Sequence, residues 1–225
     1  MSNVISNYDG ILRVFPKEPG VDTRKLQVSK EGLYSVSRPR DAEAISKIII
    51  RSMDEPANTL VVTDATANIG GNVISFSKHF KSVNAVEISL FHFSVLQNNV
   101  EVYKRENVST YCDDYLLVAP ELKQDIIFLD PPWGGVGYKS KKSLNLYLSG
   151  TPVEEIVNRI STMARMIVLK VPSNFDFKNF FNKVTTRTFT TYKIRNYMII
   201  VIRTDRGKGN INRIIKKDNK HVKHP

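Results

Sequence analysis

Cysteine is nearly absent from this sequence, and this limits the classes of protein to which the chain can belong. Cys112 is the single cysteine among 225 residues, so an intramolecular disulfide is excluded and no cysteine cluster is left to ligate zinc. No apolar run approaches the ~18–20 residues that a membrane span needs, and the opening "MSNVISNYDG" lacks the charged and apolar regions of a signal peptide. We therefore expect a soluble, intracellular protein that acts as a monomer and binds no metal.

Acidic residues are in the minority. The chain has 33 Lys and Arg against 22 Asp and Glu, which gives a formal net charge of +11. A basic excess of this size favours a polyanionic partner, nucleic acid above all. The alternative is a basic surface that serves solubility alone. We expect no membrane partner.

Apolar runs typical of strands alternate with segments of helical periodicity. We expect strands at 59–66, 82–89, 108–114, 124–130 and 165–172, and helices at 70–80, 90–103, 151–164 and 175–184. The helix at 151–164 is predicted from a threonine N-cap followed by proline at the first helical position. The runs at 186–194 and 197–205 are separated by two residues only, which predicts an antiparallel hairpin.

Strand–helix units closed by a hairpin predict an α/β fold with a seven-stranded, mostly parallel sheet and one antiparallel strand. This succession resembles the Rossmann-like class I methyltransferase fold, a relative of folds that bind ligands at the carboxyl ends of their strands. We expect the core at 56–206, preceded by a separate element at 1–55. The stretch at 207–225, which includes "KGNINRIIKKDNKHVKH", is predicted to be a basic, flexible tail.

Acidic residues follow the predicted strands. The loop "DATANIGGN" (64–72) enters a helix, where backbone N–H groups can receive a carboxylate or phosphate, although many ordinary helices begin in this way. Glu87 suits a bidentate hydrogen bond to two ribose hydroxyls, unless it is simply solvated. Asp113 and Asp114 either cap the next turn, or one of them accepts a hydrogen bond from an adenine amine. We favour Asp114 for the second role. The G-x-G-x-x-G fingerprint is missing, which argues against NAD and for another adenosine cofactor.

The stretch "FLDPPWGGVGY" (128–138) combines an acid, two prolines and the only tryptophan of the chain. An exocyclic purine amine is a poor nucleophile, and two acceptors that hold its N–H groups leave its lone pair aimed at an electrophilic methyl group. The Asp130 carboxylate and the Pro131 carbonyl can be these acceptors, since prolines restrict the backbone, and Trp133 offers a stacking face. The alternative is that the prolines only end a strand and Trp133 is an ordinary core residue.

Three segments resemble the trimethylguanosine synthases, over roughly residues 25–205. They are "KEGLYSVSRPRDAEAISKII" (30–49), "DATANIGGN" and "DPPWGGVGY". The resemblance implies methylation of the N2 amine of the 7-methylguanosine RNA cap, with S-adenosylmethionine as cofactor and S-adenosylhomocysteine as product. It also implies capped RNA as the partner and the cytoplasm or nucleus of a eukaryote, or a cell infected by a virus, as the location. Residues 1–55 would be a helical extension that closes over the site.

The resemblance also implies roles for individual residues. Trp133 would stack on the methylated guanine, with Asp130 and Pro131 beside the amine. Residues on the substrate side would be Tyr138, Lys139, Lys170, Asn174 and Tyr34. Residues around the cofactor would be Asp64, Ala65, Thr66, Asn68, Gly70, Gly71, Asn72, Glu87, Ile88, Asp114 and Asp130.

Several positions depart from the family pattern. Asn68 replaces a glycine, and asparagine tolerates the left-handed conformation that such a turn needs. Leu33 and Tyr34 replace a Trp-Phe pair. Ser173 stands where an arginine is expected, so we expect a phosphate contact to have moved to Lys170 or Lys139.

Asp130 replaces the family's serine, and this exchange keeps a second hypothesis open. It moves the site toward adenine-N6 or guanine-N2 methyltransferases that act on internal bases of RNA or DNA. That hypothesis does not explain Gly-Gly-x-x-Tyr or the segment at 30–49. A third hypothesis is a non-catalytic, methyltransferase-like RNA-binding subunit, against which the intact Asp130 and Glu87 argue.

Overall fold

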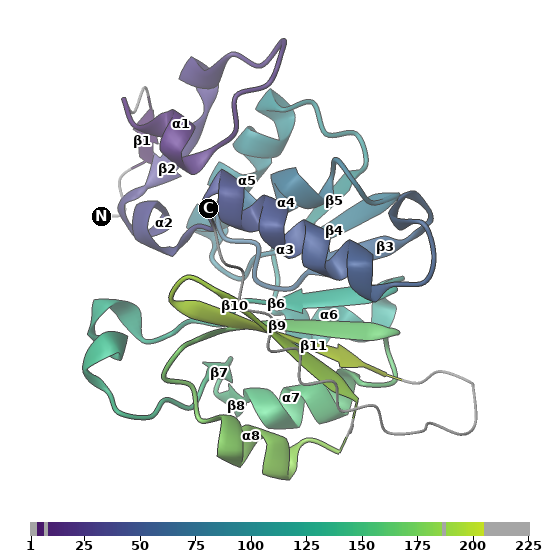
Figure 1. Ribbon diagram of the computed structural model, residues 1–225. Helices are drawn as coiled ribbons and strands as arrows, with labels where there is room; N and C mark the ends of the chain where they lie inside the picture. The colour runs from purple at the N-terminus through teal and green to yellow at the C-terminus, as the bar shows by residue number, and fades with distance from the viewer. Residues whose placement is uncertain (1–3, 7–8, 186–187, 205–225) are drawn as a thin grey trace, which may run out of the picture.

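A seven-stranded sheet forms the centre of the protein (Figure 1). The computed structural model describes residues 4–6, 9–185 and 188–204. The strand order is β10 (Phe189–Ile194), β11 (Tyr197–Arg203), β9 (Met166–Pro172), β6 (Ile126–Leu129), β3 (Val61–Asp64), β4 (Ser82–Val86) and β5 (Val108–Tyr111). Neighbouring strands from β9 to β5 are parallel, and β11 is antiparallel to both of its neighbours. The predicted fold, hairpin included, is confirmed.

The central strands are buried along their whole length. Every residue of β3, β6 and β9 is buried, whereas the edge strands β5 and β10 contain only partly buried and exposed residues. Continuous apolar runs mark strands that are covered on both faces, which is why these strands could be found in the sequence. The carboxyl ends of β3, β4, β6 and β9 therefore meet along one edge of a rigid support.

Helices cover both faces of the sheet (Figure 1). One apolar cluster joins α3 (Pro39–Ser52), α4 (Gly71–Phe76) and α5 (Leu90–Val102) to one face. A second cluster joins α6 (Tyr115–Val118), α7 (Val153–Ile160) and α8 (Phe177–Lys183) to the other. None of the helices in the described ranges is both long and apolar enough to cross a membrane.

The predicted start of the helix at 151–164 is wrong. Thr151 and Pro152 form a short strand, β8, that pairs with β7 (Tyr147–Leu148). The Thr151 side chain does not cap a helix there, because its backbone is held extended by the ladder to Leu148. Pro152 becomes the N-cap of α7, which begins at Val153.

The N-terminal part of the chain, which precedes α3, packs against α5 and the loop of residues 64–72. It contains β1 (Val4–Ser6), α1 (Ile11–Val14), β2 (Gln27–Ser29) and α2 (Lys30–Ser35). The fully buried Asn99 of α5 accepts from the Gln27 amide at 2.9 Å and donates to the carbonyls of Gln27 and Ile69 at 3.0 and 2.9 Å. Ile45 and Ile49 of α3 lie in the core cluster against the sheet. The predicted tail at 207–225 lies outside the described residues.

Candidate active site at the carboxyl ends of the strands

Polar groups from β3, β4, β6 and β9 meet at one edge of the sheet. The Asp130 amide, after β6, donates to Thr66 Oγ1, after β3, at 2.8 Å. The Asn68 amide donates to Glu87 Oε2, after β4, at 2.8 Å. Lys170 Nζ of β9 lies 2.6 Å from Asp130 Oδ2. The structure thus brings together the acidic groups that the sequence placed at separate strand ends.

The loop after β3 is held in a tight turn. Asn68 has φ +49° and Gly70 has φ +101°, both in the left-handed region. The Asn68 side chain accepts from the Ile69 amide at 2.8 Å and donates to Ser35 Oγ of α2 at 2.9 Å. Asparagine therefore adopts the conformation that the sequence required of it, and its amide also ties the loop to the N-terminal part.

Asp64 is a buried acid with one unsatisfied oxygen. The residue is 1% exposed, and its Oδ1 accepts from the Thr66 amide at 3.2 Å, while Oδ2 has no hydrogen-bond partner. Burial raises the pKa of the Asp64 carboxyl to about 8, and the charges of Asp130 and Glu87 act in the same direction. A buried acceptor of this kind fits a cationic group of a ligand, such as the ammonium of S-adenosylmethionine. The amide oxygen of the nearly buried Asn72 likewise has no partner.

Glu87 is held by backbone amides on both oxygens. Oε2 accepts from Asn68 and Oε1 accepts from Ser89, each at 2.8 Å. Each oxygen keeps a lone pair for another donor, so the carboxylate fits the two neighbouring hydroxyls of a ribose. Ile88 beside it is 61% exposed. Asp114 is the N-cap of α6, and its Oδ1 accepts from the Leu116 amide at 2.9 Å, so this acid caps the next turn with one of its two oxygens.

Asp130 forms a buried ion pair with Lys170. The two side chains are 15% and 8% exposed, and Lys170 Nζ also donates to Ser37 Oγ at 3.0 Å. Burial raises the pKa of the Asp130 carboxyl, and the Lys170 charge opposes that shift. This arrangement favours a role for Lys170 beside Asp130 over contact with a phosphate. Ser37, between α2 and α3, was missed in the sequence, since nothing in its local pattern points to a residue 133 positions away.

Trp133 lies in an aromatic group at the same edge. It is partly buried, with Tyr138 edge-on at 5.1 Å between ring centroids and Tyr197 tilted at 6.5 Å. Its ring contacts both core clusters, and its buried Nε1 has no hydrogen-bond partner. Pro131 is buried and Pro132 exposed. Tyr197 of β11 was missed because the sequence marks it only as the start of an apolar strand.

The segment after Trp133 carries basic side chains. It forms the 3-10 helix η4 (Gly135–Ser140), which follows Gly134 at φ +88°. Asn174 donates to the carbonyls of Tyr138 and Lys141 at 2.9 and 2.8 Å, which fixes the segment to the end of β9. Lys139 is exposed, with Nζ 5.9 Å from the Tyr138 ring centroid. Tyr34 of α2 is 64% exposed.

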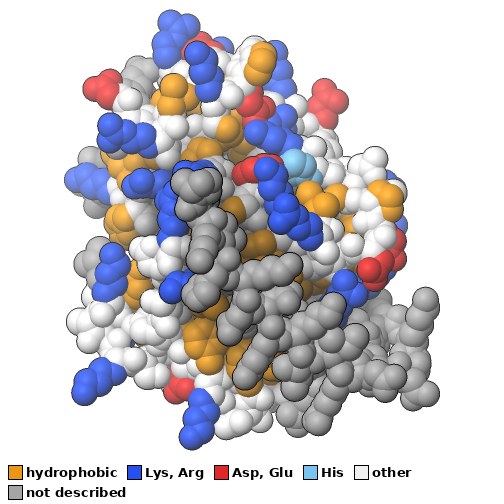
Figure 2. Space-filling view, viewed as in Figure 1, with side chains coloured by type: hydrophobic (Ala, Val, Ile, Leu, Met, Phe, Trp, Pro, Cys, Tyr) orange, Lys and Arg blue, Asp and Glu red, His pale blue; other side chains and the backbone are white. Residues whose placement is uncertain are grey.

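Basic side chains gather on the side of the molecule where α2 and η4 lie. Figure 2 shows Lys and Arg along the left edge of this view, where Figure 1 places these two segments. Exposed basic residues on these segments and beside them include Lys30, Arg38, Lys139, Lys141 and Lys142. Their charge suits a polyanion that approaches the site from this side.

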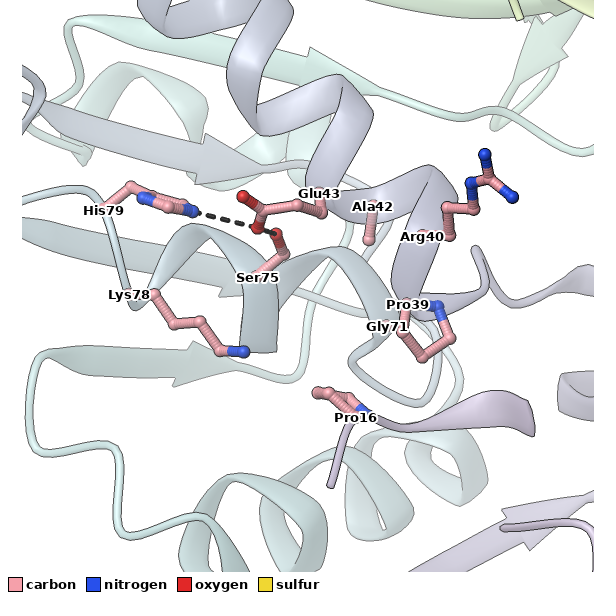
Figure 3. A pocket seen from close by; sticks show the side chains of 9 residues that line it. All are labelled: Pro16, Pro39, Arg40, Ala42, Glu43, Gly71, Ser75, Lys78 and His79. Atoms are coloured by element: carbon pink, nitrogen blue, oxygen red, sulfur yellow. Dashed lines mark hydrogen bonds and ion pairs between the residues drawn. The ribbon is translucent and has the colours of Figure 1, made fainter. Parts of the chain in front are cut away.

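A cavity of about 430 Å³ lies between α3 and α4 (Figure 3). Glu43 accepts from His79 at 3.0 Å and from Ser75 at 3.3 Å inside it. Of the predicted site residues, only Gly71 lines this cavity. The other predicted site residues do not line this cavity.

Sequence comparisons match the chain to one protein family and to several relatives. The model of the family described as RNA cap guanine-N2 methyltransferase matches residues 59–216. An uncharacterized protein of Acanthamoeba polyphaga mimivirus is 33% identical over 216 residues, with 84% of each chain covered. The trimethylguanosine synthase of Schizosaccharomyces pombe is 25% identical and covers 64% of this chain, and that of Saccharomyces cerevisiae is 24% identical and covers 73%. The matches span 62% and 53% of the two yeast enzymes.

Solved structures share the fold. The precorrin-6y C5,15-methyltransferase of Geobacter metallireducens superimposes with a TM-score of 0.54 at 16% identity, over 82% of this chain and 96% of that one. A Streptococcus mutans protein solved in complex with S-adenosylhomocysteine has a TM-score of 0.52 at 13% identity, over 75% and 99% of the two chains. At these identities the likeness establishes the class I methyltransferase fold alone.

Proposed function

The chain belongs to the RNA cap guanine-N2 methyltransferase family, and from this premise we propose that it methylates the exocyclic N2 amine of the 7-methylguanosine cap of RNA. The observation that carries the proposal is the placement of Asp130, Pro131 and Trp133. They follow β6 directly and lie beside the Asp64 loop, with Asp130 bonded to Thr66 of that loop. The residues to which we assign the acceptor, stacking and cofactor-binding roles thus lie at one edge of the sheet.

We propose S-adenosylmethionine as the cofactor, and the residues present fit it. The unsatisfied Asp64 Oδ2 would take its ammonium group, and Glu87 its ribose hydroxyls. The loop of residues 65–72 and Ile88 would line the same cofactor, with Asp114 beside the adenine. When bound, S-adenosylmethionine supplies an electrophilic methyl group.

Asp130 and Pro131 would act on the amine of the base. The Asp130 carboxylate and the Pro131 carbonyl each accept one N–H, which leaves the nitrogen lone pair free for attack. Asp130 is positioned to stabilise the positive charge that develops on the nitrogen and to receive the proton that it loses. Burial makes the carboxylate more effective, because charges interact more strongly where water is excluded.

Trp133 would bind the base. The 7-methylguanine ring carries a positive charge, and a cation over an indole ring gains ~1–2 kcal/mol. Tyr138, Lys139, Asn174 and Tyr34 lie on the segments around Trp133 or on α2, where the cap phosphates and ribose would pass. We propose that residues 1–55 close over this site as one extension of the core at 56–206, which the bond between Ser37 and Lys170 supports.

The setting of the reaction follows from its substrate. We place the protein, as a monomer, in the cytoplasm or nucleus of a eukaryotic or virus-infected cell, where capped RNA occurs. The viral and yeast origins of its relatives support this placement.

Asp130 favours a second candidate function. An acid at this position, in place of the family's serine, also suits methylation of internal adenine or guanine. We therefore test substrates side by side, with labelled S-adenosylmethionine and a panel of GTP, 7-methyl-GTP, capped RNA, uncapped RNA and DNA. We expect label on capped RNA and 7-methyl-GTP only. Equal labelling of uncapped RNA or DNA would instead support the second function.

Substitution of Trp133 tests the recognition of the cap. Trp133→Ala should raise KM for 7-methyl-GTP about tenfold and remove the preference for 7-methyl-GTP over GTP, because the preference depends on the cation–π contact. Trp133→Phe keeps a smaller aromatic ring, so its KM for 7-methyl-GTP should lie between those of the wild type and Trp133→Ala. Steady-state kinetics with both nucleotides measures the effect. A preference that survives Trp133→Ala would place the base elsewhere.

A further inference from the structure

Lys170 carries a charge into the interior of the site. It belongs to β9, between β6 and β11, and its side chain is 8% exposed. A buried ammonium group is unfavourable unless it is paired and hydrogen-bonded. Nζ has both kinds of partner, Asp130 Oδ2 at 2.6 Å and Ser37 Oγ at 3.0 Å. The two partners therefore offset the cost of burying the Lys170 charge.

The same ammonium group lies against the aromatic group of the site. Nζ is 5.4 Å from the ring centroid of Trp133 and 5.1 Å from that of Tyr197. An unpaired cation at this distance repels a positively charged base on Trp133. The carboxylate of Asp130 cancels that field, so the pair leaves no net charge beside the indole ring.

We propose that Lys170 is a positioning residue that forms one charge-compensated unit with Asp130. Lys170 holds the carboxylate in place for the amine, and Asp130 in turn cancels the lysine charge so that Trp133 accepts a cationic purine. The proposal rests on the proposed function, because it assumes that a purine stacks on Trp133. It also explains how an acid can stand at position 130, where the family has an uncharged serine.

Ser37 completes the unit. It lies in the short connection between α2 and α3, so its bond to Nζ reaches the pair from the N-terminal part. Lys170 is thus held from two sides, by a residue of the core and by a residue of the segment that packs over it. Ser37→Ala should lower kcat less than a change of Lys170 itself.

A double-mutant cycle tests the unit. The proteins are the wild type, Asp130→Asn, Lys170→Met and the double variant, and calorimetry gives the Kd of each for 7-methyl-GTP and GTP. Asp130→Asn leaves the lysine charge unopposed and should weaken 7-methyl-GTP about tenfold more than GTP. Removing Lys170 as well should restore the wild-type preference to within about threefold. Lys170→Met alone should lower kcat at least tenfold, because the carboxylate is no longer held in place, and should increase the preference for 7-methyl-GTP over GTP, because the carboxylate charge is then unopposed.

Controls separate this unit from an effect on folding. Lys183→Met removes a lysine from another acid, since Lys183 lies 3.1 Å from the buried Glu154 on α7, and it should leave kcat and both Kd values unchanged. If Lys170→Met fails to fold, Lys170→Arg keeps the charge and should keep the nucleotide preference. If Asp130→Asn changes the preference for 7-methyl-GTP over GTP equally in the wild type and in Lys170→Met, the inference about the pair is wrong, while the proposed function still stands. A wild type that binds neither nucleotide would overturn the proposed function together with it.

Discussion

Asp64 couples the site to pH through a single carboxyl group. Its pKa in the folded protein is about 8, above the ordinary value of 3.8 for an aspartate, because the group is buried. Folding therefore favours the neutral form of the carboxyl group. Its contribution to the free energy of unfolding is complete below pH ~4 and is lost as pH rises toward 8. Asp64→Asn is neutral at every pH, so its stability relative to wild type should rise by on the order of 1 kcal/mol per pH unit over this window. Urea unfolding between pH 5 and 9 measures the difference, and parallel curves would contradict it.

The same carboxyl group predicts a proton linked to cofactor binding. An ammonium group on Asp64 Oδ2 favours the ionised acid, so S-adenosylhomocysteine should bind with release of a fraction of a proton at pH 7. Calorimetry in two buffers with different ionisation enthalpies measures that release. Asp64→Asn should abolish it and weaken binding by ~1–3 kcal/mol. Wild-type binding without proton release would place the cofactor's ammonium group away from Asp64.

At the scale of elements, the contact between the N-terminal part and α4 depends on one glycine. A Cβ added at Gly71 would lie 2.4 Å from Val36 Cγ2 and 2.6 Å from the Ser37 carbonyl oxygen. Because the second atom belongs to the backbone, Gly71→Ala should push the segment away from α4 and break the bond between Ser37 and Lys170. We expect a loss of ~1–3 kcal/mol in stability, earlier proteolysis near Arg38 and reduced methyl transfer.

Gly137→Ala is the matched control for this change. An added Cβ at Gly137 meets no atom within 4 Å, so the unfolding midpoint should stay close to that of the wild type. Limited proteolysis of both variants compares the segment directly. Identical digestion of Gly71→Ala and wild type would mean that the segment accommodates the extra methyl group without moving.

The elements also show what the sequence can and cannot predict. β3, β6 and β9 were predictable because strands buried on both faces are apolar throughout, and the residues at their carboxyl ends followed from chain direction. The start of α7 was not predictable, because a proline such as Pro152 is equally compatible with the first helical position and with an N-cap that follows a short strand. Ser37 and Tyr197 were not predictable either. Their contacts with Lys170 and Trp133 depend on how segments far apart in the sequence pack together. The residues next to a serine or a strand tyrosine in the sequence do not indicate such a contact.

At the scale of the whole molecule, charge should govern the approach of RNA. Residues 206–225, which lie outside the described ranges, contain seven Lys or Arg and one Asp, more than half of the net charge of +11. Each phosphate contact contributes about −0.7 to the slope of log K against log salt for a single strand. Removal of residues 206–225 should make that slope shallower by about 2 or more for a capped oligonucleotide. Activity on a cap dinucleotide should persist, because every element of the sheet ends before residue 204.

Filter binding at several salt concentrations measures the two slopes. The affinity for S-adenosylhomocysteine is the internal control, since a compact ligand bound by buried groups should respond little to salt. Equal loss of activity on the dinucleotide and on RNA would instead make the removed residues part of the fold.

Trp133 is the only tryptophan of the chain, and it lies at the proposed base-binding position with an ammonium group and two tyrosine rings around it. The tryptophan fluorescence of the protein therefore arises from a single residue at this edge of the sheet. A base stacked on the indole should quench that light, whereas binding of S-adenosylhomocysteine should change it less. The molecule thus carries a built-in optical probe, and a stopped-flow record of its emission would time the arrival of the cap without any added label.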